Sequence, residues 1–242
     1  MKKCVLLLFL TVTLLFSACS KEPVVDPAIG ADGVDNYSGS RFVLVRRHGE
    51  WSYKLFSMKY TGADEDRENP ATFDPETDTM AEYMRQHNWT MGDKSLPRSV
   101  LDDVASWEVV TGNFGDDGDY EEVDIGFAGD NHGLMICTTF DIADLEEFRY
   151  TFKKVNLYSH YDNTVSIYLN GTLVYRHSID ESGTPDWTGD YECLNTYYQE
   201  VNAYFIGDDE LMNLLVQGQN TLFAMVKDGW GGRVLVLGMD CY

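Results

Sequence analysis

The sequence is poor in the residue types that build a disulfide scaffold, a zinc centre or a basic binding surface. Its 242 residues include only five cysteines and six prolines, and acidic residues outnumber basic ones by 40 to 18. No two cysteines share a CxxC or Cys/His ligand spacing, which excludes the usual structural zinc site. The formal charge of −22 excludes nucleic acid as a partner, because such a surface repels phosphates.

Familiar catalytic motifs are missing as well. The chain has no GxSxG elbow, HExxH helix or P-loop, and no GxGxxG turn follows a strand. The histidines are scattered singly, and among 40 acids chance carboxylate pairs identify no glycosidase site. We therefore expect a non-catalytic protein, with an unrecognised hydrolase as the less favoured alternative.

The one long apolar run of the sequence lies at the N-terminus. Lys2 and Lys3 precede an apolar run over residues 4–16, which is too short to span a membrane comfortably. The order Phe16-Ser17-Ala18-Cys19 resembles the bacterial lipobox, with Phe16 where Leu is usual. This resemblance implies cleavage before Cys19, lipid on its sulfur and an outer-membrane lipoprotein, with cell-surface exposure left open. An ordinary secretory signal is the alternative.

Composition separates a signal peptide and a tether from the rest of the chain. Residues 1–18 read as the signal peptide, and residues 19–40, rich in glycine, proline and small polar residues, read as a flexible tether. Removing residues 1–18 leaves 16 basic and 40 acidic residues, a charge of −24. Cys137, Cys193 and Cys241 then remain, so at most one internal disulfide can form, and buried free thiols are the simpler expectation.

Residues 41–95 read as an N-terminal extension with strands and one short helix. Apolar residues alternate on both sides of His48-Gly49-Glu50, which predicts a hairpin. Residues 78–87 combine an aspartate in capping position with helix formers and predict a helix. The same stretch contains Asp78-Thr79-Met80, which resembles a short O-glycosylation acceptor of exported Bacteroidota proteins.

Residues 96–242 read as mainly β. Residues 149–162 predict a strand with Tyr150, Phe152, Val155 and Leu157. Asn170-Gly171 between two apolar stretches predicts a hairpin with a type I′ turn, since both residues accept positive φ angles. Many short strands separated by turns indicate a β-sandwich or jelly roll.

Three stretches of this region resemble the galactose-binding-like jelly rolls of bacterial glycoside hydrolases, including the sugar-binding domain of β-galactosidases, and the N-terminal domains of glutaminase-like lipoproteins. They are Trp107 with Phe114-Gly115, the strand 162–171 that ends in Asn-Gly, and 214–222 with its Gly-x-Asn turn. The resemblance implies a β-sandwich with a small N-terminal extension. These motifs specify the fold better than the function, because function depends on the site that a fold carries.

Aromatic and polar residues in the predicted loops are the candidates for sugar binding, since a ring stacks on a pyranose while polar side chains hydrogen-bond its hydroxyls. They are Trp187, Tyr191, Asp228, Trp230, Arg233, Asp162 and His160. For Trp107 we favour packing in the core, whereas Trp187 and Trp230 lie in polar loop sequence.

The acidic stretch with Asp116, Asp117 and Asp119 could hold a structural Ca²⁺, although a solvated loop is the commoner reading. No other cofactor is expected. Together these observations favour a lipid-anchored, non-catalytic module that binds glycan within a polysaccharide-handling system. A structural lipoprotein that docks a partner enzyme or transporter is the alternative.

Overall fold

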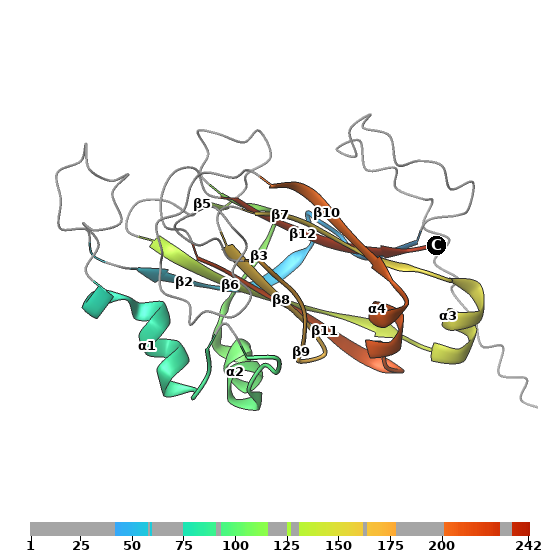
Figure 1. Ribbon diagram of the computed structural model, residues 1–242, viewed down its shortest axis with the longest axis horizontal. Coiled ribbons are helices and arrows are strands. Elements are labelled where there is room, and N and C mark those ends of the chain that lie inside the picture. Colours follow the sequence, from blue (N-terminus) through green and yellow to red (C-terminus); the bar gives the residue numbers. More distant parts are fainter. Residues whose placement is uncertain are drawn as a thin grey trace, which may run out of the picture. The chain divides into compact units, whose positions relative to one another are not determined.

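The strands form two packed sheets (Figure 1). The structure, a computed structural model, describes residues 42–57, 59, 75–90, 93–115, 125–126, 131–161, 164–177, 201–227 and 234–242. Residues 41–242 form one compact unit.

Sheet A has the strand order β10-β7-β12-β4-β5, and β1 also pairs with β12. Its pairs are antiparallel except for the short parallel pair of β4 and β5. The strands are β1 (Phe42–Val45), β4 (Phe114–Gly115), β5 (Ile125–Gly126), β7 (Val155–Tyr161), β10 (Val201–Asp208) and β12 (Val234–Cys241).

Sheet B has the order β3-β2-β6-β11-β8-β9 and is antiparallel throughout. Its strands are β2 (Glu50–Ser57), β3 (Glu108–Thr111), β6 (Asn131–Ile142), β8 (Thr164–Leu169), β9 (Thr172–His177) and β11 (Gly218–Lys227). From β6 to β8, and again from β10 to β12, successive strands belong to alternate sheets. The expected mainly β sandwich is therefore confirmed.

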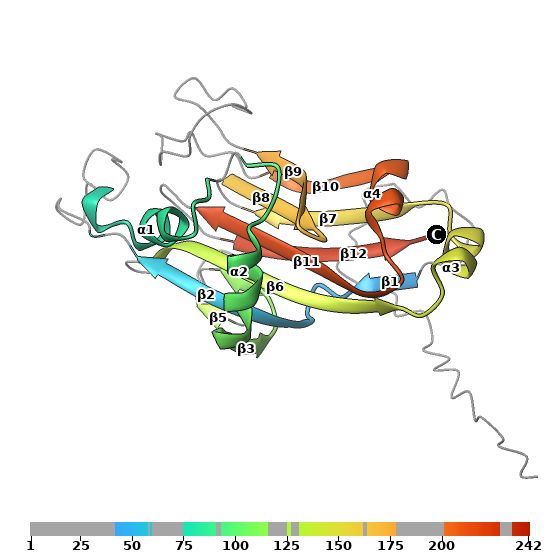
Figure 2. The ribbon, with the colours of Figure 1, turned by 90° about the horizontal axis from the view of Figure 1, so that it is seen from below.

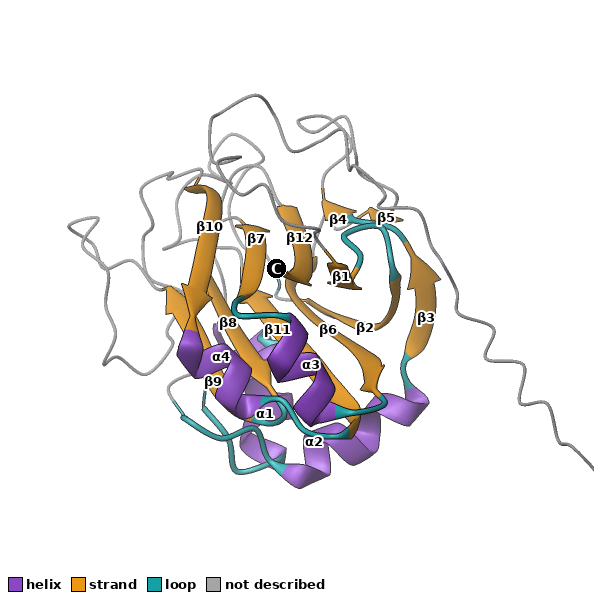
Figure 3. Cartoon of the chain, turned by 90° about the vertical axis from the view of Figure 1, so that its right-hand side faces the viewer, coloured by secondary structure: helices purple, strands orange, loops and turns teal. Residues whose placement is uncertain are grey.

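The main core lies between the sheets. Leu235, Leu237 and Met239 of β12 point inward, where they join Leu222 and Ala224 of β11 in one apolar cluster. At one end, α3 (Leu145–Thr151) and α4 (Asp209–Leu214) close this core with partly or fully buried side chains. Figure 3 shows both helices in front of the strand ends.

A second apolar cluster covers the outer face of sheet B. There α1 (Thr79–Gln86) and α2 (Arg98–Asp103) lie across the strands (Figure 2), flanked by the 3-10 turns η3 (Pro75–Thr77) and η4 (Val104–Ser106). Phe223 of β11 is fully buried, 6.0 Å in ring-centroid distance from Trp89, Trp107 and Tyr168 alike. The expected packing role of Trp107 is therefore confirmed.

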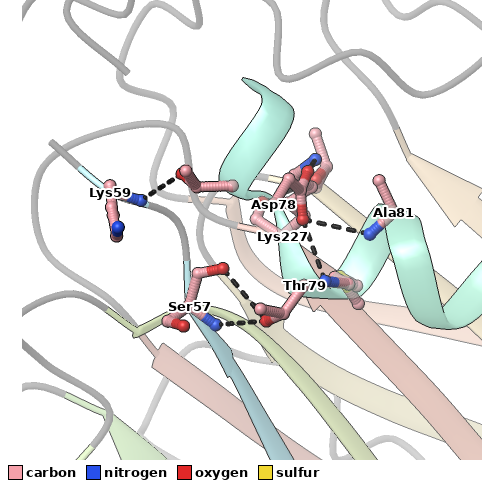
Figure 4. A network of polar contacts seen from close by, with 9 residues as sticks. Ser57, Lys59, Asp78, Thr79, Ala81 and Lys227 are labelled. Carbon is pink, nitrogen blue, oxygen red and sulfur yellow. Dashed lines mark hydrogen bonds and ion pairs between the residues drawn. The ribbon is translucent and has the colours of Figure 1, made fainter. Parts of the chain in front are cut away.

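The first turn of α1 is fixed to both neighbouring strands (Figure 4). Asp78 caps the helix by accepting hydrogen bonds from the amides of Met80 and Ala81, each at 3.0 Å, and it forms a buried ion pair with Lys227 of β11. The Thr79 hydroxyl accepts from the Ser57 amide at 2.8 Å and donates to the Ser57 carbonyl at 3.0 Å. Asp78 and Thr79 therefore hold the start of α1 against β11 and β2.

Two sequence predictions of local structure are confirmed. The helix expected over residues 78–87 is α1, with Asp78 as its N-cap. The Asn170-Gly171 turn joins β8 and β9 with φ angles of 50° and 77°, as a type I′ turn requires.

Two other predictions are wrong. The residues around His48 do not form a hairpin, because β1 pairs with β12 in sheet A whereas β2 pairs with β3 and β6 in sheet B. Residues 150 and 152 do not belong to a strand, because Asp144 caps α3 through the amides of Glu146 and Glu147. The segment expected as an N-terminal extension thus supplies a strand to each sheet and the helix α1.

Candidate functional site

Most of the predicted ligand residues lie outside the described residues. Among the seven sugar-binding candidates, only His160 is described. Cys19 and the calcium candidates Asp116, Asp117 and Asp119 also lie outside the described ranges. The six sugar-binding candidates outside the described ranges are Trp187, Tyr191, Asp228, Trp230, Arg233 and Asp162.

His160 lies on β7, opposite Val236 of β12, and is half-buried. Its neighbours in the strand, such as Tyr161, point into the core between the sheets. Since successive side chains of a strand point to opposite faces, His160 lies on the outer face of sheet A.

Arg47 crosses the same face. Its guanidinium carbon lies 3.3 Å from the centre of the Tyr158 ring, and its stem runs over Gly238. A Cβ at Gly238 would lie 2.9 Å from Arg47 Cγ, so the absence of a side chain there lets the arginine approach the strand. The close ring contact is a cation–π interaction, and burial of Arg47 strengthens it.

Farther along the same two strands, Asn156 and Asp240 form a buried polar pair. Asn156 Nδ2 donates to Asp240 Oδ1 at 3.2 Å and to the Tyr242 hydroxyl. Both side chains are about 95% buried, with exposed fractions of 4% and 5%. Their register partners show that they point to the same face as Tyr158.

We name this set the sheet A face, consisting of Arg47, Asn156, Tyr158, His160 and Asp240. It combines a guanidinium and an amide as donors with a carboxylate acceptor, an imidazole and an aromatic ring. These are the side-chain types that hold a hydroxyl-rich ligand. Except for Arg47, which lies in the turn between β1 and β2, they stand on β-strands of a packed sandwich, so the backbone fixes their spacing.

A second polar cluster ties the helical layer to sheet B. Asp103 Oδ2 accepts hydrogen bonds from Trp107 Nε1 and the Tyr83 hydroxyl, both at 2.9 Å, and from Lys54 Nζ at 3.1 Å. The indole bond is the largest cause that holds the pKa of Asp103 well below its usual range, and the Lys54 and Tyr83 bonds add to it. Burial, with the bond to Asp103, raises the pKa of Tyr83. The three donors come from β2, α1 and the turn after η4, so this cluster fastens elements together.

Neither described cysteine forms a disulfide. Cys137 lies in the cluster under the helices, whereas Cys241 lies between the sheets. Burial raises the pKa of each thiol to about 12. Cys193 lies outside the described residues.

In the described part of the chain, no group of three or more His, Cys, Asp or Glu side chains is arranged to hold a metal ion. The calcium prediction concerns other residues and stays a prediction. Across the same described ranges, no helix combines the length and apolar character needed to cross a membrane.

Comparison with known proteins gives no family. No family model and no curated protein matches the chain. Among solved structures, the chain is similar to a β-D-mannosidase from Dictyoglomus thermophilum, with 13% identity and a TM-score of 0.31 over 78% of this chain and 16% of that one. It is also similar to the PA14 domain of the antifreeze protein MpAFP, with 9% identity and a TM-score of 0.26 over 85% of each chain. At these values the likenesses identify no function.

Sequence reasoning missed most of the sheet A face. Arg47 and Tyr158 are 111 positions apart, and only the pairing of β12 with both β1 and β7 brings them together. One signal was present: Asn156, Tyr158 and His160 alternate with Val155, Leu157 and Tyr161, so polar residues occupy one face of a strand whose other face is apolar.

Proposed function

We propose that this chain is a non-catalytic, lipid-anchored carbohydrate-binding module of the bacterial cell envelope. The observation that carries the proposal is the sheet A face, where an aromatic ring, a guanidinium, an amide, an imidazole and a carboxylate share one side of two paired strands. Trp187 and Trp230 stay ligand candidates on the sequence alone.

A saccharide ligand suits this chemistry better than an apolar one. Each sugar hydroxyl both donates and accepts a hydrogen bond, so a site for it needs donors and acceptors together. Asn156 and Asp240 are buried and bind each other, so the half-buried Tyr158 and His160 would meet the sugar. Stacking on an aromatic ring adds contact with the C–H face of the sugar.

Affinity gel electrophoresis of the chain from residue 20 onward, with soluble plant, host and microbial polysaccharides, tests the proposal. We expect retardation by at least one polysaccharide. His160→Ala and Trp230→Ala should each weaken it, by roughly tenfold where one hydrogen-bonded or stacked group is lost. Tyr150→Ala, which removes an 82% exposed aromatic of α3, is the matched control and should bind like the unchanged chain.

Three results would count against the glycan site: no retardation by any polysaccharide, retardation unchanged in both variants, or equal loss in the Tyr150→Ala control. Pull-down of a transporter or hydrolase in the absence of glycan would support the alternative of a protein-docking lipoprotein. Polysaccharide turnover that depends on one Asp or Glu would instead revive a hydrolase.

The lipid anchor is tested separately. We expect Cys19→Ala to remove metabolic labelling by radioactive palmitate and to release the protein from the membrane fraction. Ser20→Ala is the control and should keep both the label and the membrane association. A Cys19→Ala chain that stays labelled and membrane-bound would contradict the anchor.

A further inference from the structure

Two side-chain amides join the turn between β8 and β9 to the turn that leads from α4 into β11. Asn170 Nδ2 donates to the Leu214 carbonyl and to Asn220 Oδ1, both at 2.8 Å. Asn170 Oδ1 accepts from the Thr221 amide, also at 2.8 Å. Both polar atoms of the Asn170 side chain are therefore bound to residues more than 40 positions away along the chain.

Asn220 is the fully buried half of this network, with an exposed fraction of 0%. Its Oδ1 also accepts from the Val216 amide at 2.9 Å. Its Nδ2 donates to the carbonyls of Val216 and Gly218, at 2.8 and 3.0 Å. The Gly-x-Asn stretch of the sequence thus forms a rigid turn that receives the Asn170 amide.

The backbone of Asn170 and Gly171 is held as well. The Asn170 amide donates to the Thr221 carbonyl at 2.9 Å, and the Gly171 carbonyl accepts from the Leu96 amide at 2.8 Å. Leu96 lies just before α2, so the turn contacts β11 on one side and the segment that leads into α2 on the other. Hydrogen bonds from separate parts of the chain therefore fix this dipeptide.

Asparagine followed by glycine is also the dipeptide most prone to spontaneous deamidation, and Asn170-Gly171 is its one occurrence in the sequence. The Gly171 backbone nitrogen attacks Asn170 Cγ, a new C–N bond forms, and the side-chain nitrogen leaves as ammonia. Water then opens the resulting succinimide to aspartate or isoaspartate. Glycine has no side chain to hinder the attack, whereas the β-branched Thr221 after Asn220 does.

The fold opposes this reaction. The attack makes Cγ tetrahedral and releases Nδ2, so the Asn170 amide cannot keep its hydrogen bonds to Leu214, Asn220 and Thr221. Each net hydrogen bond corresponds to about a factor of five in an equilibrium constant. Loss of three such bonds therefore lowers the reactive fraction roughly a hundredfold.

Deamidation would also prevent the turn from closing again. An ionised aspartate at position 170 has no hydrogen to donate. It would face the Leu214 carbonyl and Asn220 Oδ1, which are both acceptors, so the two bonds that Nδ2 makes would be lost and the charge repelled. Refolding cannot restore the ammonia that has left.

We propose that Asn170-Gly171 is a latent deamidation site that acts as a one-way latch on the turn between β8 and β9. The folded network protects the site, opening of the turn exposes it, and deamidation then keeps the turn from closing. This inference depends on neither the lipid anchor nor the glycan site.

Peptide mass spectrometry tests the protection. The chain from residue 20 onward is incubated in mildly alkaline buffer, either folded or unfolded in guanidinium chloride, and conversion of Asn170 is followed in its tryptic peptide. We expect conversion in the folded chain to be roughly a hundredfold slower than in the unfolded chain. Equal rates in the two samples would overturn the proposal.

Asn220→Ala tests whether the network provides the protection. It removes one acceptor of the Asn170 amide, so deamidation of the folded chain should become at least roughly fivefold faster. Asn213→Ala, an exposed asparagine of α4, is the matched control and should leave the rate unchanged. An unchanged rate in a folded Asn220→Ala chain would contradict the latch. If circular dichroism shows that Asn220→Ala does not fold, the comparison of folded and unfolded chains still decides.

Asn170→Asp reproduces one product and tests the one-way step. We expect its folding equilibrium constant, from urea unfolding, to fall at least roughly 25-fold, because two donated bonds are lost. Asn88→Asp is the matched control, since Asn88 is exposed and has nearly the same φ angle, 51° against 50°. Its constant should change at most about threefold, through the adjacent end of α1. Equal stability of the two variants would show that deamidation does not disable the turn.

Discussion

The two outer faces of the sandwich differ in the chemistry of the side chains that they carry. On sheet B, Met135, Phe223 and Met225 point outward and are buried under α1 and α2. On sheet A, the corresponding outward positions of β7 and β12 hold Asn156, Tyr158 and Asp240. An apolar outer face has to be covered to be stable, whereas polar side chains such as Asn156 and Asp240 can hydrogen-bond one another. The comparison assigns a stabilising role to the first face, and the glycan site that we propose lies on the second.

Phe223→Ala should have the largest effect on stability. The ring is fully buried among three other aromatic rings, so its removal should lower the free energy of unfolding by about 4 kcal/mol. Urea unfolding followed by circular dichroism measures the loss. Val236→Ala, on the outer face of sheet A, should cost only about 1–2 kcal/mol. Similar losses in both variants would break the distinction between the faces.

Lys227→Met should come next. The substitution leaves the buried carboxylate of Asp78 without its cation, which should cost about 3 kcal/mol. Lys227→Met/Asp78→Asn should recover part of that loss, because an asparagine can still cap α1 without a charge. A double variant less stable than Lys227→Met would show that the ion pair is not what couples α1 to β11.

Asp103→Asn should show a smaller loss of about 1–2 kcal/mol at pH 7 that depends on pH. The folded state lowers the pKa of Asp103, so its ionised form stabilises the fold above the unfolded value of about 3.9. This contribution is lost as the pH falls from about 4 toward the folded pKa. Urea titrations at pH 7 and in acid should therefore show the gap between the variant and the unchanged chain closing; a gap independent of pH would contradict the role of the charge.

Cysteine labelling should show the smallest effect and sharpen the comparison. In a Cys193→Ser chain from residue 20 onward, both remaining thiols are buried with a pKa of about 12, so iodoacetamide at pH 8 should modify neither until unfolding. Mass spectrometry of tryptic peptides distinguishes the two sites. Equal rates mean that the helical layer and the sandwich open together, whereas faster labelling of Cys137 would mean that α1 and α2 detach first.

Local patterns were sufficient where neighbouring residues decide the structure. The cap at Asp78 and the Asn170-Gly171 turn depend on hydrogen bonds and φ angles within a few residues, so the sequence predicted both correctly. The supposed hairpin at His48 failed because alternation shows that two strands exist but not which sheet each joins. The strand predicted through Tyr150 failed because the capping of α3 by Asp144 outweighs a short alternating pattern.

The sequence by itself determined the β-rich class, the first helix, one hairpin and the expectation of a lipid anchor at Cys19, since these depend on local composition and spacing. Only the tertiary structure decided that β6 and β11 are buried on both faces, that Arg47 covers Tyr158, and that Phe42 meets α3. Each of these depends on pairing between segments far apart in the chain. Strand pairing is set by the packing of the whole sandwich, which no single stretch of sequence specifies.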